Sequence, residues 1–189
     1  IADEVQTGAG RTGTWFACEQ WPVAPDLITT AKSLAGGFPL SGVVGRADVI
    51  DAPAAGGLGG TYAGSPVACA AALAVMKAFE EEKLLQRSQD MGAFLVEKLK
   101  AIATKVPAIG DVRGIGAMVA IELFEGGDVH RPDAVLTKKV VTEAARRGLI
   151  LLSCGTYGNV IRILVPLTAP DALLEEGLAI LADSFAASL

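Results

Sequence analysis

The segment DLITTAKSLAGG (residues 26–37) is an apolar, β-branched run that stops at a lone lysine, with a serine and two glycines just beyond. Residues 27–31 are predicted to form a strand, because such runs bounded by glycines are typical of strands. Two similar short strands are predicted at residues 1–5 and 40–44, each followed by a glycine-bearing loop. This pattern predicts an α/β sheet with functional loops at the strand ends. A strand normally ends in a turn residue, so the long cation of Lys32 at a strand end requires a chemical reason.

The composition limits the classes of function. The chain has 189 residues, of which 51% are hydrophobic and 20% charged, so it can bury a core in one large domain or two small ones. A formal net charge of -5 argues against a nucleic-acid or anionic-membrane partner and leaves small molecules as the expected partners. Three widely spaced cysteines (Cys18, Cys69 and Cys154) are interpreted as reduced core thiols, which favours a cytoplasmic location.

Further along the chain the pattern of predicted strands and helices changes, which predicts a division into domains. The chain opens on the end of an apolar strand, so we expect it to be the C-terminal part of a longer protein. The predicted parts are a partial large domain (residues 1–81), a connecting helix (82–105) and a small α+β domain (106–189). The further elements expected are helices at 66–79, 82–105, 133–147 and 171–187, a pair of strands joined at glycines within 109–124, and strands at 149–152 and 160–165.

Two nucleotide-binding patterns are considered and rejected. GAGRTG, with Gly8, Gly10 and Gly13, formally matches the dinucleotide fingerprint G-x-G-x-x-G. That fingerprint should open a helix, whereas TWFACEQWP follows here, with two tryptophans and a proline. The AKS sequence at Lys32 lacks the glycines of a phosphate-binding P-loop. No metal site is predicted, because His130 is the only histidine and lies in a loop.

The chemistry of a lysine amine explains the position of Lys32 at a strand end better than a P-loop does. An amine whose pKa is lowered can form a Schiff base with an aldehyde, and pyridoxal 5'-phosphate is an aldehyde cofactor. Its ring nitrogen needs a carboxylate, and strand alternation would place Asp3 and Val5 on one face, as a charge and an apolar contact for the ring. Gln6 could reach the ring hydroxyl, and Thr61, in the glycine-rich GGTYAG, could bind the phosphate.

Four motifs carry a resemblance to a known family. IADEVQTGAGRTG, DLITTAKSLAGGFPLSGV, GGTYAGSPVACAAALAV and RGLILLSCGTYGNVIRILVPLTAP together resemble the class III, pyridoxal-phosphate-dependent aminotransferases of fold type I. The resemblance covers the whole chain and implies the C-terminal part of the large domain, mainly a parallel sheet with helices, followed by a small α+β domain. Within the family, GGLGGTYAGSP and SCGTYGNVIR resemble the enzymes that act on 4-aminobutyrate.

The resemblance also implies roles for individual residues. Lys32 would form the Schiff base, Asp3 would hold the ring nitrogen, Gln6 would contact the ring hydroxyl, Thr61 would bind the phosphate across a dimer interface, and Arg162 would clamp the substrate carboxylate. The implied reaction transfers the amino group of 4-aminobutyrate to 2-oxoglutarate, which gives succinate semialdehyde and glutamate. The implied assembly is a homodimer or a dimer of dimers.

Several alternatives remain open. The protein could be an ornithine, diamine or 5-aminovalerate aminotransferase, a racemase of the same fold, or a catalytically silent fragment that serves in folding or as a dimer partner. Lys32 alone would more often be a solvated strand-end lysine, and Thr61 could be a helix cap. Alternation puts the Arg162 guanidinium on an otherwise apolar strand, where a buried guanidinium must meet an anion. That anion is either a substrate carboxylate or a permanent protein partner.

Overall fold

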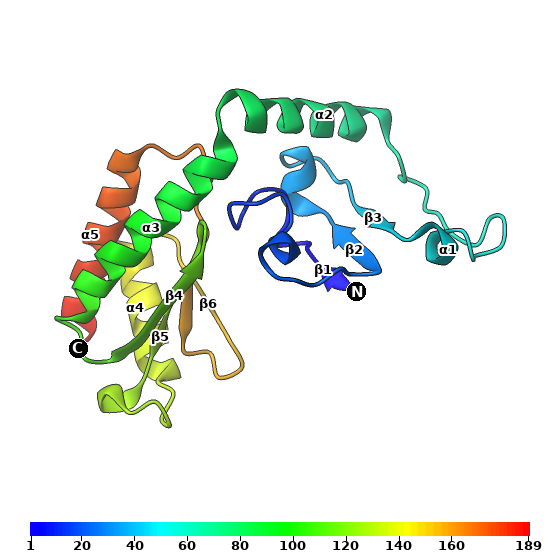
Figure 1. Cartoon of the computed structure of the whole chain (residues 1–189). Helices are drawn as coiled ribbons and strands as arrows, with labels where there is room; N and C mark the ends of the chain where they lie inside the picture. Colours follow the sequence, from blue (N-terminus) through cyan, green and yellow to red (C-terminus); the bar gives the residue numbers. More distant parts are fainter. The chain divides into compact units, whose positions relative to one another are not determined.

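The computed structural model describes all 189 residues and divides into two compact units, Ile1–Ser88 and Gln89–Leu189. Figure 1 labels the helices and strands of both units. No helix combines the length and the apolar character needed to cross a membrane.

The first unit is built on a three-stranded sheet in the order β1-β2-β3. β1 (Ala2–Asp3) is parallel to β2 (Leu27–Thr30), and β2 is antiparallel to β3 (Gly42–Gly45). β1 is shorter than the predicted strand at residues 1–5, because the chain turns after Glu4. The expected alternation of Asp3 and Val5 on one strand face is therefore wrong: Val5 belongs to a turn.

A turn-rich loop with one short 3-10 helix, η1 (Ala17–Gln20), connects β1 to β2. Gly13 is followed by bends and then by the single turn of η1, not by the α-helix that a dinucleotide fingerprint opens. Instead the loop packs on α2 (Pro66–Glu81), where the rings of Trp15 and Phe79 lie 5.0 Å apart between centroids, at 39°. The glycines of this loop therefore serve close packing.

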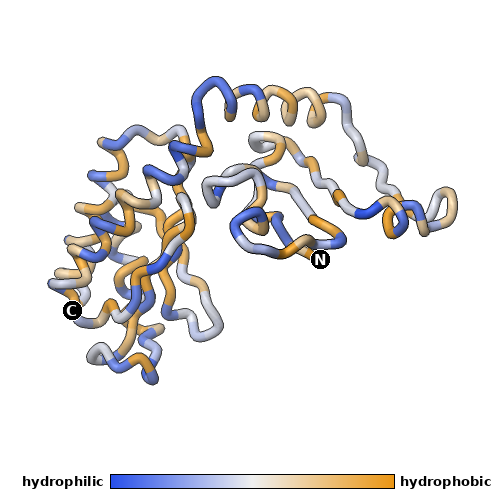
Figure 2. The backbone as a smooth tube through the Cα atoms, in the orientation of Figure 1, coloured by the Kyte–Doolittle hydropathy of each residue, from blue (hydrophilic) through white to orange (hydrophobic).

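Helix α2 is apolar on more than one side. Pro66 occupies its first turn, where the missing N–H has no cost. Ala68, Ala72 and Phe79 are buried, and the helix contacts the 3-10 helix η2 (Lys32–Ala35). The other side exposes apolar side chains at Val67, Leu73 and Met76. Figure 2 accordingly shows pale or orange colours along most of α2. The first unit also contains the one-turn helix α1 (Ala47–Ile50).

We expect Gly10→Ala to destabilise the complete protein by about 2–4 kcal/mol. Gly10 has φ +81°, a conformation that costs any residue with a Cβ, and an added Cβ would overlap the Phe79 ring. The free energy of unfolding from urea denaturation measures the effect. Gly56→Ala is the matched control, because Gly56 has φ +78° and nothing within 4 Å of an added Cβ. Equal losses in the two variants would contradict the role of the Phe79 contact.

The second unit contains an antiparallel four-stranded sheet in the order β4-β5-β7-β6, with helices against one face (Figure 1). Helix α3 (Leu84–Ala103) runs across the division between the units. Strand β5 alternates between half-buried and buried residues, and Val119, Ile121 and Leu123 have no exposed surface. The other bounds are β4 Ile109–Ile115, β5 Met118–Leu123, η3 Glu125–Gly127, α4 Ala134–Arg146, β6 Leu152–Cys154, β7 Val160–Ile163 and α5 Asp171–Ser188.

The strand predicted at residues 149–152 is displaced. β6 pairs with β7 only from Leu152, because Gly148, with φ +93°, turns the chain sharply after α4. Residues 149–151 line an apolar cavity instead of extending the sheet. An apolar run of this length carries no signal that separates a strand from a cavity lining. β7 likewise ends at Ile163, before the predicted limit at residue 165.

Candidate active site

Asp3 and Lys32 lie at the same edge of the first unit's sheet. Asp3 is paired with Thr29 in the parallel β1–β2 register, and the N–H of Glu4 continues the ladder to the Thr29 carbonyl at 2.9 Å. Lys32 follows the end of β2 by two residues. The carboxyl ends of adjacent parallel strands form the edge at which α/β sheets bind ligands. Asp3 and Lys32 therefore lie at, or just beyond, the carboxyl ends of two adjacent parallel strands.

The Lys32 backbone has an unusual conformation. Its φ is +48°, in the left-handed region, where a side-chain-bearing residue costs about 1–2 kcal/mol. This residue turns the chain from β2 into η2, which ends at Gly36 with φ +58°. The side chain is exposed. Backbone strain of this kind persists only where the surrounding structure enforces it, and it is concentrated at functional sites.

The Asp3 carboxylate is oriented by its immediate neighbours. Its Oδ1 accepts a hydrogen bond from the N–H of Val5 at 3.1 Å and one from the hydroxyl of Thr29 at 3.3 Å. Both donors meet the same oxygen, and the side chain is exposed. A carboxylate held in this way by strand and turn can present negative charge to a cationic group of a ligand.

Glu4 is a buried carboxylate that the sequence reasoning missed. It is 3% exposed; its Oε1 accepts from the N–H of Cys18 at 2.7 Å, and its Oε2 accepts from the N–H of Ala17 at 3.0 Å and from the Thr7 hydroxyl. Burial by itself raises the pKa of Glu4, but the hydrogen bonds outweigh burial and hold the pKa below its ordinary value. The carboxylate is therefore ionised at neutral pH.

Glu4 also affects its neighbour Cys18. Burial, followed by the hydrogen bond to Glu4, raises the pKa of the Cys18 thiol, so the thiol stays protonated.

The sequence gives only a weak signal for the buried role of Glu4. That signal is a threonine three residues after Glu4 and a glycine four residues after it. The expectation that the three cysteines lie in the core is wrong: Cys69 is exposed, and Cys18 and Cys154 are only half-buried.

Val5 and Gln6 occupy the turn directly after Glu4, next to Asp3. Val5 is half-buried and Gln6 is exposed, and both follow directly on the strand end that carries Asp3. A carboxylate, an amide, an apolar side chain and an amine are the group types that the pyridoxal ring and its aldehyde require. The residues at this edge fit that cofactor.

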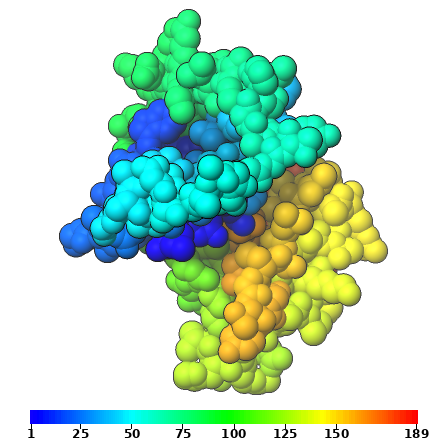
Figure 3. Space-filling view, turned by 90° about the vertical axis from the view of Figure 1, so that its right-hand side faces the viewer, coloured from blue at the N-terminus to red at the C-terminus, as the bar shows by residue number.

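Thr61 is not brought together with these residues. It lies in the exposed loop between α1 and α2, where a turn is closed by the N–H of Ala63 and the carbonyl of Gly60 at 2.9 Å. Figure 3 shows the cyan segment, around residues 45–60, on the surface in that view. Thr61 is therefore exposed to solvent and lies apart from Asp3 and Lys32 in the sequence and in the secondary structure.

Arg162 lies in β7 of the second unit, paired with Ala120 of β5 and Leu152 of β6. It is half-exposed, so the expectation of a buried guanidinium is wrong. Strand alternation places it on the sheet face opposite the buried Ile161 and Ile163. Arg113 lies in the same row of side chains, because it is paired with Ala120 from the other side, and it forms ion pairs with Asp111 and Glu122.

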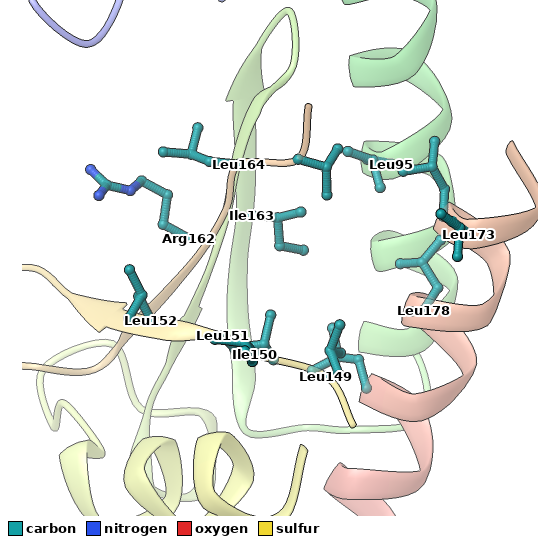
Figure 4. A pocket seen from close by; sticks show the side chains of 14 residues that line it. Leu95, Leu149, Ile150, Leu151, Leu152, Arg162, Ile163, Leu164, Leu173 and Leu178 are labelled. Atoms are coloured by element: carbon teal, nitrogen blue, oxygen red, sulfur yellow. The ribbon is translucent and has the colours of Figure 1, made fainter. Parts of the chain in front are cut away.

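A cavity of about 250 Å³ lies beside β7 and is almost entirely apolar. Figure 4 shows the Arg162 guanidinium pointing away from Leu95 and Leu178, two of the leucines that line it. Arg162 is the one charged residue in this lining, and the other lining residues are apolar or glycine. The cavity therefore borders the strand that carries Arg162, with the guanidinium directed away from its leucines.

Comparison with known proteins decides the family. The family model described as aminotransferase class-III matches residues 1–185. The chain belongs to the class-III aminotransferases. The class-III enzyme 5-aminovalerate aminotransferase DavT of Pseudomonas aeruginosa is 68% identical over 185 residues, covering 98% of this chain and 43% of its own length. The 4-aminobutyrate aminotransferase GabT of Escherichia coli is 65% identical over 185 residues, again 98% of this chain and 43% of its own length.

Solved structures agree with this assignment. A transaminase from the marine bacterium Virgibacillus superimposes with a TM-score of 0.90 at 32% identity, over 99% of this chain and 44% of that chain. This similarity confirms the expected fold class. The chain spans less than half the length of each of these relatives.

Proposed function

We propose that the complete protein is a pyridoxal-phosphate-dependent aminotransferase that transfers the amino group of 4-aminobutyrate to 2-oxoglutarate. The observation that carries the proposal is the placement of Lys32 and Asp3 at the carboxyl ends of adjacent parallel strands. When bound, the cofactor supplies an aldehyde that receives the amine and a ring that takes up an electron pair from the substrate carbon.

The roles of the chain's own residues follow from their chemistry. The Lys32 amine would hold the cofactor and, once displaced by substrate, move a proton between two carbon atoms. The Asp3 carboxylate, already fixed by Val5 and Thr29, would keep a proton on the ring nitrogen. The Gln6 amide would hydrogen-bond the ring hydroxyl, and the Val5 side chain would cover the ring.

We propose further that the protein acts as a homodimer, or as a dimer of dimers, in which Thr61 of one copy binds the cofactor phosphate held by the other. In support, Thr61 is exposed in a glycine-bearing loop that precedes α2, where an anion can approach the backbone closely. The exposed apolar side chains Val67, Leu73 and Met76 on the same helix require cover in an assembled protein.

5-Aminovalerate is the second candidate donor, favoured by the 68% identity to the Pseudomonas aeruginosa enzyme. The test measures kcat/KM of the complete protein for 4-aminobutyrate, 5-aminovalerate and ornithine, with 2-oxoglutarate as acceptor and glutamate as the measured product. We expect 4-aminobutyrate to give the largest value. A larger value for 5-aminovalerate or ornithine would change the assigned amine donor. Racemisation of an amino acid without glutamate formation would indicate a racemase. The absence of a cofactor absorbance would indicate a catalytically silent protein.

We expect Arg162→Lys to raise KM for 2-oxoglutarate. The increase should correspond to a loss of about 1.5–3 kcal/mol of binding free energy, the scale of a charged hydrogen bond. The planar guanidinium can hold a carboxylate with two parallel bonds, which an ammonium cannot. The half-reaction with 4-aminobutyrate should suffer less, because that substrate has no α-carboxylate. Stopped-flow measurement of the two half-reactions checks this.

Arg113→Lys is the matched control for this prediction, because Arg113 lies in the same row of the sheet but is paired with Asp111 and Glu122. It should leave both half-reactions close to the wild type. If Arg162→Lys instead damaged both half-reactions equally and lowered the melting temperature strongly, Arg162 would be a structural ion-pair partner.

A further inference from the structure

We propose that Glu4 is a positioning residue, whose buried carboxylate fixes the strand end that carries Asp3, Val5 and Gln6 and so sets the orientation of the Asp3 carboxylate. The proposal rests on the proposed function, because Asp3 is taken as the partner of the cofactor ring. Glu4 itself is excluded from that role, since it is 3% exposed and both its oxygens are engaged by the loop.

Glu4 is held at three places. Its N–H bonds to the Thr29 carbonyl on β2 at 2.9 Å, and its carbonyl accepts from the N–H of Gly8 at 2.9 Å. Its side chain holds the N–H groups of Ala17 and Cys18, thirteen and fourteen residues further along the chain. One residue thereby ties the end of β1 to the neighbouring strand, to the following turn and to the distant η1 segment.

The residues around Glu4 are the ones that hold Asp3. The donor of the first bond to Asp3 Oδ1 is the N–H of Val5, the next residue after Glu4. The second donor is the hydroxyl of Thr29, whose carbonyl is the acceptor of the Glu4 N–H. A shift of Glu4 would therefore displace the adjacent Val5 N–H and loosen the backbone bond that aligns Asp3 with Thr29.

The loop leaves little freedom for an alternative arrangement. A Cβ added at Gly8 would lie 2.7 Å from the Glu4 carbonyl oxygen and 3.2 Å from Glu4 Cβ, so the turn closes tightly around this residue. The carboxylate inside this turn carries charge and meets three donors, and such charge-assisted bonds are about twice as strong as neutral ones. Loss of the charge should therefore loosen the turn while leaving the rest of the sheet in place.

The test compares Glu4→Gln with Glu19→Gln in the complete protein. Gln at position 4 keeps the shape and one acceptor oxygen, but its NH2 group must face a backbone donor. Glu19 is the matched control, because its Oε1 accepts from the N–H of Phe16 at 2.6 Å in the same loop but has no bond to residues 3–6. Thr7→Val, which removes only the hydroxyl donor to Glu4 Oε2, is a milder second variant.

The first measurement is amide hydrogen exchange of the cofactor-free protein. We expect the Val5 amide to exchange about 10- to 100-fold faster in Glu4→Gln, a smaller increase in Thr7→Val, and no change in Glu19→Gln. The second measurement is the pH midpoint at which the visible absorption band of the lysine-bound cofactor changes, together with kcat at saturating substrates. Both should shift in Glu4→Gln and remain unchanged in Glu19→Gln.

The outcomes separate this proposal from the proposed function. A Glu4→Gln protein with a lower melting temperature but an unchanged Val5 exchange rate, absorption midpoint and kcat would overturn the positioning role and leave Glu4 a purely structural residue. If the wild-type protein bound no pyridoxal phosphate, the proposed function would fail. The exchange comparison would then still decide whether Glu4 orders the segment that carries Asp3.

Discussion

Lys32→Ala is expected to abolish the visible absorption of bound pyridoxal phosphate in the complete protein and to reduce turnover by at least about 10⁴-fold. Both effects have one cause, because the same amine would anchor the cofactor and carry the proton. The structure supports this expectation through the position of Lys32 at the sheet edge beside Asp3. The measurements are the absorption spectrum and the initial rate of glutamate formation.

A second substitution at the same position separates catalysis from folding. Because the Lys32 backbone has φ +48°, Lys32→Ala keeps the strained conformation, whereas Lys32→Gly relieves it. The glycine variant should be more stable than the alanine variant by about 1 kcal/mol, with turnover equally low in both. Lys77→Ala is the control, since Lys77 is exposed on α2 and paired only with Glu81. Normal turnover in Lys32→Ala would refute the catalytic role of Lys32.

Asp3→Asn is expected to leave bound cofactor but to slow proton abstraction by about 10²–10³-fold, the scale of losing one preorganised electrostatic group. Asparagine keeps an Oδ1 that can accept from Val5 and Thr29, so the local geometry should survive. Only the negative charge is lost, and with it the stabilisation of a proton on the ring nitrogen. Single-turnover kinetics with 4-aminobutyrate measure the abstraction step directly.

The control for Asp3→Asn is Asp26→Asn in the same unit. Asp26 is an exposed aspartate whose Oδ1 pairs with Arg46 at 3.0 Å, and such exposed pairs contribute little. Its replacement should leave the single-turnover rate unchanged. A near-normal rate in Asp3→Asn would assign the ring nitrogen to another group.

The sequence predicted most helices well because their signals are local. The helix expected at 133–147 is α4, Ala134–Arg146, and its Asp133 N-cap accepts from the N–H of Leu136 at 2.8 Å. The helix expected at 171–187 is α5, Asp171–Ser188. Apolar periodicity and capping residues are both contained in the helical segment itself, so these elements need no knowledge of the rest of the fold.

The strands were predicted less well, because their limits depend on partners. β1 ends at Asp3 since the chain turns after Glu4, and β6 starts at Leu152 since Gly148, with φ +93°, turns the chain sharply after α4. Neither cause is visible in a short apolar run. The same limitation hid Glu4, whose bonding partners Ala17 and Cys18 are brought to it only by the fold. In contrast, Lys32 and Asp3 could be proposed from the sequence because each carries chemistry that its strand does not need.

The position of Asp3 depends on the correct register between β1 and β2, because Asp3 is paired with Thr29 in that register. A slip of one residue between β1 and β2 would turn every side chain of the displaced strand to the opposite face. The Asp3 carboxylate would then lose its place opposite Thr29, even if the sheet were otherwise intact. Visible absorption after addition of pyridoxal phosphate would accordingly indicate that β1 and β2 are paired in the native register. The absorbance per mole of protein would measure the fraction of chains that folded in that register.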